Sequence, residues 1–161
     1  MSAILAPIPR VIFTIIEPFS LLCGFLGPIV SPRSFIADQI IDISHPEDVT
    51  SHEIILALQL GNLYLLLAFI GISVLYTTTS SRLVRNYFLA LAAGDIGHVA
   101  MTYHVLGHQQ FLDVKGWTPV IWGNIGFTAF LFFARIAYLT GALGKDKTNL
   151  SAADATDKKN T

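Results

Sequence analysis

Residues 86–108 read NYFLALAAGDIGHVAMTYHVLGH, and this stretch decides the fold. It is long and apolar enough to cross a bilayer, whose hydrocarbon core of about 30 Å requires about 20 apolar residues in a helix. Near its middle it carries Asp95 and His98, which a helix places on one face, one turn apart. An acidic side chain at this depth is costly, so it usually faces protein or water and often has a function. The stretch therefore predicts a membrane helix with an inward-facing polar side.

The composition agrees with several membrane spans. The chain has 161 residues, enough for one domain, and 53% of them are hydrophobic while 13% are charged, a balance unusual for a soluble domain. The formal net charge of -1 includes no basic excess, so we expect no nucleic-acid partner. Cys23 is the single cysteine, which excludes an internal disulfide, and its apolar neighbours predict a small buried residue.

We predict an all-α fold, a bundle of four transmembrane helices. The spans are expected at about 11–30, 54–76, 83–106 and 118–140. Glu17 and Pro18 interrupt the first span and no A-x-A site follows, which favours a membrane helix over a cleaved signal peptide. Pro18 should also kink this helix, because proline lacks the backbone N–H.

The four spans form one predicted domain, residues 1–141, followed by a polar tail at 142–161 that we expect to be disordered. The first connection is acidic, and residues 34–43 predict a short amphipathic helix that His45-Pro46 ends. Thr50 and Glu53 have the spacing of a capping box that begins the second span.

Four spans place both termini on one side of the membrane. The basic residues near helix ends on that side are Arg10, Arg82, Arg85, Lys145 and Lys147. The opposite side has only Arg33 and Lys115 near helix ends. By the positive-inside rule both termini are cytosolic. We expect a multi-pass integral membrane protein, with the endoplasmic reticulum as the favoured organelle.

Glu17 and Arg135 are expected to form an ion pair. Each lies about 10 Å from the cytosolic end of its span, counting about 1.5 Å per residue, so the two side chains can meet. A buried pair of this kind fixes how the first and fourth helices dock, and we prefer this structural role to a catalytic one. Arg85, near the same face of the membrane, is a competing partner for the acid.

A second set of polar residues lies near the midplane. Asn62 and Asn124 reach depths similar to Asp95, and Gln59 lies one turn from Asn62, so three spans can converge there. One interpretation is a hydrogen-bond network that specifies helix packing. The other is a pocket in which Asp95 and His98 act as a catalytic acid/base pair while Asn62, Gln59 and Asn124 bind a substrate. Desolvation would favour the neutral form of such a carboxyl group.

Three small residues accompany this polar set on the third span. Ala90, Gly94 and Gly97 would let a neighbouring helix approach closely, as small residues do in membrane helices.

The histidines at 104 and 108 raise the question of a metal. They are four residues apart, and with Asp113 or His45 they would supply enough ligands. The HxxxH pair has no HExxH motif and no third ligand at a fixed spacing, so histidines solvating the helix end are the preferred interpretation. We expect no metal and no cofactor. The sequence also has no GxSxG, Walker or GxGxxG motif.

Several motifs together resemble a known family. They are RVIFTIIEPFSLLCG from residue 10, GDIGH from residue 94, Trp117 with WGNIGFT from residue 122, and Arg135. The combination resembles an uncharacterised fungal family of small four-helix integral membrane proteins, a domain of unknown function, over nearly the whole chain except the tail. The resemblance implies a fungal membrane protein without an established reaction. Some small fungal membrane proteins belong to secondary-metabolite pathways.

Two functions of different classes follow. The first is a protein that binds or converts a lipophilic metabolite, by cyclisation or isomerisation with intramembrane acid/base groups. Membrane terpene cyclases use intramembrane acids, but they have seven helices, so they offer only an analogy. The second is a non-catalytic membrane scaffold or subunit, whose polar residues pack helices. Ion transport is less favoured, since no inverted repeat is visible. The partners expected are the lipid bilayer and a lipophilic small molecule, and oligomerisation stays open.

Overall fold

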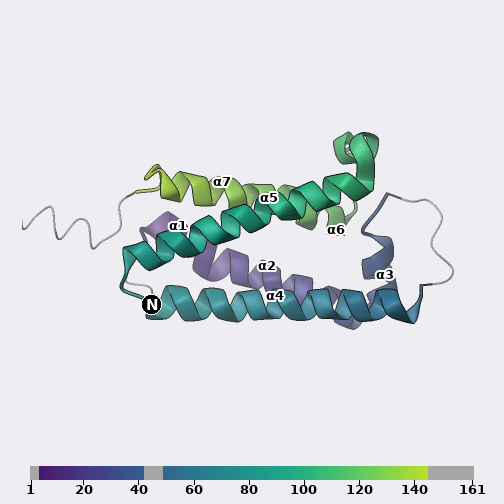
Figure 1. Ribbon diagram of the computed structural model, residues 1–161, viewed down its shortest axis with the longest axis horizontal. Helices are drawn as coiled ribbons and strands as arrows, with labels where there is room; N and C mark the ends of the chain where they lie inside the picture. The colour runs from purple at the N-terminus through teal and green to yellow at the C-terminus, as the bar shows by residue number, and fades with distance from the viewer. Residues whose placement is uncertain (1–3, 42–48, 145–161) are drawn as a thin grey trace, which may run out of the picture.

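The computed structural model describes residues 4–41 and 49–144, and in these ranges the chain is helical without strands (Figure 1). The elements are α1 (Pro7–Val11), η1 (Ile12–Ile16), α2 (Glu17–Val30), α3 (Pro32–Ala37), α4 (Ser51–Thr77), α5 (Ser81–Leu112), α6 (Pro119–Ile121), η2 (Trp122–Phe127) and α7 (Thr128–Leu139). The all-α prediction is confirmed for the part of the chain that the structure describes.

Three helices are long and apolar enough to cross a membrane. They are the continuous helices Pro7–Val30, Ser51–Thr77 and Pro119–Leu139. The predicted span at 83–106 lies within α5, which is longer but less apolar because it carries arginines, histidines and Asp95. Length and composition therefore support three spans, and α5 is not among them.

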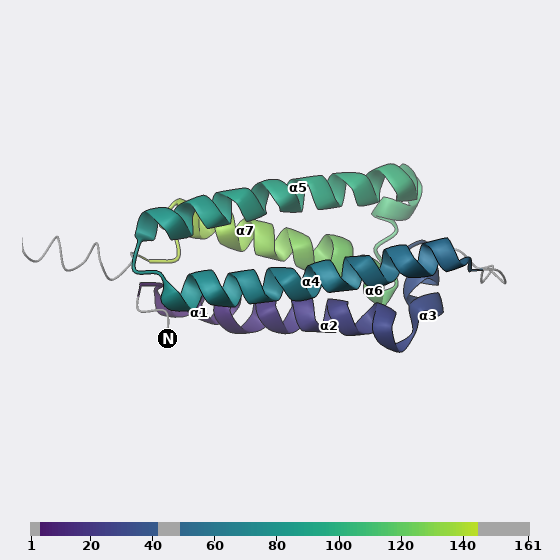
Figure 2. The same cartoon turned by 60° about the horizontal axis from the view of Figure 1, so that its bottom comes forward.

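The long helices form two pairs that lie side by side. Helix α2 packs along α4, and α5 packs along α7 (Figures 1 and 2). Helix α1 and the last turn of α7 lie at the same end of the bundle, where the short turn between α4 and α5 also lies. The arrangement places the beginning and the end of the helical region together, as an even number of long antiparallel helices requires.

Glycines bring α2 and α4 into close contact. A Cβ atom at Gly61 would lie 2.8 Å from Cγ of Pro28 and 3.1 Å from the carbonyl oxygen of Phe25. A Cβ atom at Gly24 would lie 2.9 Å from the Tyr64 ring. These distances leave no room for a larger residue, so this pair uses the small-residue packing known from membrane helices.

The close approach predicted along α5 is wrong. A Cβ atom at Gly94 or Gly97 would meet nothing within 4 Å, so no neighbouring helix packs against either residue. The physical reason is that Ala90 and Gly94 line a cavity instead of an interface.

Two apolar clusters lie at opposite ends of the bundle, and the first of them joins the two pairs. At the end near α1, the pairs share a core of buried residues from α4, α5, α7 and the N-terminal region: Leu5, Ile12, Phe13, Leu75, Val84, Phe88, Leu131, Ala134 and Tyr138. At the other end, a smaller cluster joins Leu106 of α5 to Ile121 and Ile125, with Ile41, Phe111 and Trp117 packed against it. The middle of the bundle has no such apolar core among the described residues.

Two π-helical segments interrupt the first and last long helices. Segment η1 ends directly before Glu17 and Pro18, so the helix accommodates the proline through a wider turn. Segment η2 begins at Trp122 and includes Asn124. Such bulges are frequent at functional sites because they rotate the side chains beside them. Here they lie beside two of the predicted site residues.

The first connection agrees partly with its prediction. The capping box is confirmed, because Oγ1 of Thr50 accepts a hydrogen bond from the Glu53 amide at 3.3 Å and the Glu53 carboxylate accepts one from the Thr50 amide at 2.7 Å. Helix α3 ends at Ala37, earlier than the predicted helix at 34–43. The predicted stop at His45-Pro46 and the tail from residue 145 lie outside the described residues.

Candidate functional site

A buried arginine joins two carboxylates at the centre of the site. Arg135 of α7 is 1% exposed and donates from Nη2 to Oε1 of Glu17, at the start of α2. Its Nη1 donates to Oδ2 of Asp95, on α5, at 2.5 Å. One guanidinium therefore ties three helices from both pairs together.

The Glu17–Arg135 ion pair expected from the sequence is present in the structure. The sequence does not predict the Asp95–Arg135 contact, because counting residues places Asp95 near the midplane and Arg135 about one and a half turns from a helix end. The long arginine side chain bridges this difference in depth. A signal was available, since an apolar region with two acids and one arginine tends to bring all three charges together.

Other contacts of the arginine are apolar or absent. Its guanidinium carbon lies 5.7 Å from the ring centroid of Phe13, within the range of a cation–π interaction. Its Nε is buried and has no hydrogen-bond partner among the described residues.

Arg85, the competing partner for the acid, instead donates to the carbonyl oxygen of Leu139 at 3.1 Å. That contact caps the C-terminal end of α7.

A second hydrogen-bonded chain lies further along the bundle. Nε2 of His98 and Oδ1 of Asn124 are 3.3 Å apart, so α5 contacts the π-helical segment η2. The amide of Asn124 donates to Oε1 of Gln39 at 2.8 Å. Thr118 donates to the carbonyl oxygen of Asp38 at 2.5 Å. These bonds fasten the segment after α3 to the start of the last long helix.

Gln39 belongs to the site although the sequence does not indicate it. It lies in a connection, and nothing in its spacing links it to Asn124, which is 85 residues away in the chain.

The expected convergence of Asn62 and Gln59 on Asp95 is not found. Both side chains are exposed on α4, and neither lines the cavity beside Asp95. Helix α4 buries Ala57, Gly61 and Ala68, which lie along one side, and the two polar residues fall outside that stripe. Similar depth in a span was therefore insufficient, because rotation about the helix axis decides which residues meet.

A cavity of about 780 Å³ contains the whole charged cluster in its lining. Its polar lining includes Glu17, Asp95, His98, Asn124 and Arg135. Most of its remaining wall is apolar, and five aromatic rings contribute to it: Phe19, Phe35, Tyr64, Tyr87 and Phe127. The cavity lies between the two helix pairs, since its lining residues come from α2 and α4 on one side and from α5, η2 and α7 on the other.

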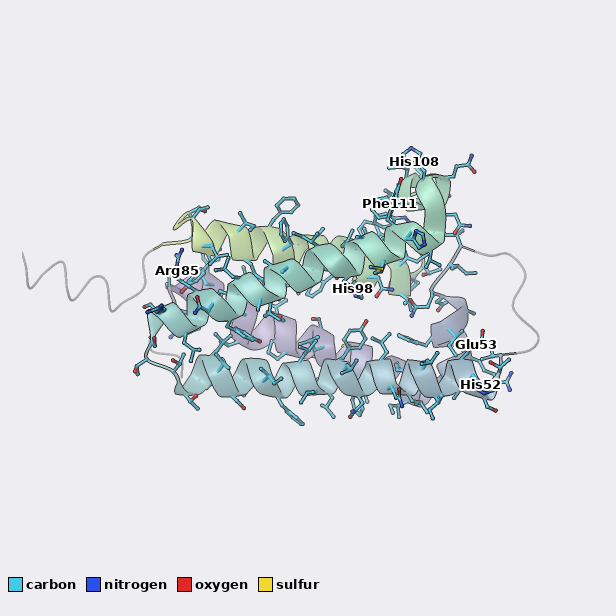
Figure 3. The ribbon with its side chains drawn as sticks, viewed as in Figure 1. His52, Glu53, Arg85, His98, His108 and Phe111 are labelled. Atoms are coloured by element: carbon cyan, nitrogen blue, oxygen red, sulfur yellow. The ribbon has the colours of Figure 1, made fainter. Side chains whose placement is uncertain are left out.

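The sequence of α5 explains one wall of this cavity. Tyr87, Ala90, Gly94 and His98 recur every three or four residues, so they form one stripe along the helix. Figure 3 shows where His98 lies on α5, between Arg85 near one end and His108 and Phe111 beyond the bend. The small side chains in the stripe leave the space that a larger residue would fill.

Cys23 also lines the cavity, and the prediction that it is buried is wrong. It is exposed, as are Phe19 and Gly94 in the same lining. The cavity therefore opens to the outer surface of the bundle. The apolar neighbours of Cys23 in the sequence indicated an apolar environment but did not distinguish a packed core from a cavity wall.

The geometry separates the two residues predicted to act as an acid/base pair. Asp95 is bonded to Arg135, His98 is bonded to Asn124, and no hydrogen bond joins Asp95 to His98 among the described contacts. Both side chains nevertheless line the same cavity. A second cavity of about 420 Å³ also includes Asp95 in its lining, and Tyr103, Phe111 and Phe132 contribute to its wall.

The histidines near the end of α5 do not form a shared face. Gly107, between His104 and His108, has φ 71° and ψ 170°, which breaks the helix and turns its last residues aside. Both histidines are exposed, and the described residues contain no group of three or more ligands suited to a metal ion. His45, a further candidate ligand, lies outside the described residues.

Comparison with known families gives one match. The family described as Domain of unknown function (DUF7704) matches residues 2–145 of the chain. No curated protein and no solved structure shows significant similarity to it.

Proposed function

The chain belongs to the DUF7704 family, whose description assigns no activity, and we propose that it is a four-span membrane protein that binds a lipophilic small molecule between its two helix pairs. The observation that carries this proposal is the cavity of about 780 Å³, with mostly apolar walls and a buried charged cluster in one of them. Cavities of this size, with apolar walls and a few converging polar groups, are typical of small-molecule sites.

Membrane insertion is supported by the outer surface. Large apolar side chains are exposed on every long helix, for example Phe19 at 68%, Leu56 at 65%, Met101 at 69% and Phe133 at 68%. A surface of this kind is unfavourable in water and suits lipid tails. We propose that α5 crosses the membrane as the fourth span, with Asp95 turned toward Arg135 and away from lipid.

We further propose that both termini face the cytosol, because the described arginines near helix ends at the α1 end of the bundle outnumber those at the other end. The endoplasmic reticulum stays the favoured organelle, and a role in a fungal secondary-metabolite pathway stays a proposal that rests on the resemblance of the motifs.

A catalytic role would use the same cavity. A bound lipophile would contact Asp95 and His98 separately, since each has its own partner. Cyclisation or isomerisation by these groups would require one to donate a proton to the ligand and the other to accept one. Binding of a lipophile requires only the cavity and the charged cluster, so binding is the primary proposal and catalytic conversion the secondary one.

A non-catalytic scaffold is the alternative function. One observation favours it, namely that the Glu17–Arg135–Asp95 cluster connects α2, α5 and α7, as a purely structural device would. If the protein is a scaffold, a substitution that fills the cavity without altering the cluster should not change which lipophiles copurify with the protein.

The test uses two glycines on α5. Gly94→Leu would place a side chain in the cavity, whereas Gly97→Leu would place one on the same helix outside the cavity lining. Neither position has an atom within 4 Å of a new Cβ, so both variants should fold. Each protein is purified in the same detergent, and its retained lipophiles are extracted and identified by mass spectrometry.

We expect the wild-type protein and Gly97→Leu to retain a specific lipophile, and Gly94→Leu to lose most of it. Equal retention by all three proteins, or retention of bulk lipid alone, would contradict binding in the cavity and favour the scaffold.

A further inference from the structure

We propose that the ligand is a lipophilic amine, whose ammonium group binds between Glu17 and Asp95 while its apolar part fills the cavity. This inference rests on the proposed function and names the chemical class of ligand. It comes from the charges, the hydrogen bonds and the walls of the cavity.

The charged cluster has more acid than base. Glu17 and Asp95 are two carboxylates, and Arg135 is the one arginine or lysine in the cavity lining. Glu17 is 7% exposed and Arg135 is 1% exposed, so water solvates this cluster poorly. With both acids ionised, the cluster has one uncompensated negative charge in an environment where charge is costly. An ammonium group would make it neutral.

Each carboxylate also has one oxygen that accepts no hydrogen bond from the described residues. Glu17 uses Oε1 and Asp95 uses Oδ2 to bind Arg135, and no described residue donates a hydrogen bond to Oε2 of Glu17 or Oδ1 of Asp95. An ammonium group carries only donors, up to three of them. A carboxylate oxygen accepts such a donor, and charge-assisted bonds of this type are the stronger class of hydrogen bond.

Other polar head groups fit less well. A carboxylate would add a third negative charge to the two already present. A hydroxyl group can donate only one hydrogen bond and leaves the charge uncompensated. The buried Nε of Arg135 does not favour an acceptor on the ligand, because this atom has no accessible surface.

The walls of the cavity suit the apolar part of a lipophilic amine. The aromatic rings of Tyr87 and Phe127 belong to the same lining as the two carboxylates, and aromatic faces attract organic cations. The opening beside Cys23 and Phe19 lies on an apolar surface, so an amine dissolved in the bilayer has a direct path to the cluster.

The single cysteine provides the measurement. Cys23 lines the cavity, so a bound ligand should slow its reaction with a maleimide probe. The protein is placed in phosphatidylcholine nanodiscs, and the rate is measured with dodecylamine, dodecanol and dodecanoate, which share one chain length. We expect dodecylamine to protect Cys23 at a concentration at least about tenfold lower than dodecanol does, and dodecanoate to protect least.

A matched control places the thiol one residue away. In Cys23→Ser/Leu22→Cys the cysteine lies outside the cavity lining, so none of the three compounds should protect it. In Glu17→Gln and in Asp95→Asn the advantage of the amine over the alcohol should disappear.

The outcomes separate the inference from the proposed function. If dodecanol protects Cys23 as well as dodecylamine does, the charge of the cluster does not select an ammonium group, and the amine inference is wrong although the cavity binds lipophiles. If no compound protects Cys23 more than the control thiol, both the inference and the proposed function are wrong. The comparison of dodecylamine with dodecanol uses the wild-type protein alone, so the conclusion about the amine does not depend on whether the variants fold.

Discussion

Two glycines in similar apolar helices have opposite surroundings. Gly61 of α4 lies against Pro28 and Phe25 of α2, whereas Gly94 of α5 faces a cavity with nothing near it. The helices differ in the same way: α4 packs closely against α2 through Gly61, whereas beside Gly94 the contacts of α5 include polar ones to Arg135 and Asn124. A stretch of small residues therefore marks either a tight interface or an empty space, and only the neighbouring helices decide which.

The largest effect is expected at the charged cluster. In Arg135→Met the two carboxylates lose their shared cation while remaining buried. Removing one partner from a buried ionic group costs about 3–5 kcal/mol. The measurement is thermal unfolding of the purified protein in detergent, followed by helical circular dichroism.

The control for that experiment removes the charges together. The triple variant Glu17→Gln/Asp95→Asn/Arg135→Met has no uncompensated charge, so most of the lost stability should return. If the triple variant is as unstable as Arg135→Met, lost packing against Phe13, not charge, explains the effect.

A smaller effect is expected from Gly61→Ala in the packed pair. The added Cβ would lie 2.8 Å from Pro28 and 3.1 Å from the backbone oxygen of Phe25, so the two helices must move apart. Overpacking of this type costs about 1–3 kcal/mol. The same thermal unfolding experiment measures it, and an unchanged midpoint would mean that α2 and α4 do not approach as closely as described.

The smallest effect, and one of opposite sign, is expected from Gly94→Ala. The new methyl group meets no atom within 4 Å, and alanine favours a helix over glycine by up to about 1 kcal/mol. The variant should therefore unfold at the same or a slightly higher temperature than the wild type. A clear loss of stability would indicate that another helix occupies the space beside Gly94.

Much of the helical content follows from the sequence, because apolar segments of about 20 residues are typical of long helices. The ion pair between Glu17 and Arg135 was also predictable, since the depth of a charged residue in an apolar span limits its partners. The capping box at Thr50 was predictable because it depends only on residues close in sequence.

The remaining features depend on rotation and on distant neighbours. Asn62 and Gln59 have the right depth but lie outside the face of α4 that packs against other helices. Gln39 contacts Asn124 through a fold that brings together residues 85 positions apart. Gly107 breaks α5 between His104 and His108, so their spacing of four residues does not place them on one face of a helix. No pattern within one helix contains this information.

The most direct test of the central claim maps where a lipophile binds. A photoactivatable alkylamine carrying a diazirine is crosslinked to the protein in nanodiscs, with and without an excess of unlabelled dodecylamine, and the adducts are located by mass spectrometry. The account predicts that the competitor removes adducts on cavity residues such as Phe19, Tyr87 and Phe127, and leaves those on exposed residues of α4 such as Leu63 and Leu66 unchanged. If excess dodecylamine reduces the adducts at none of the cavity residues, the claim that a lipophile binds in the cavity is wrong.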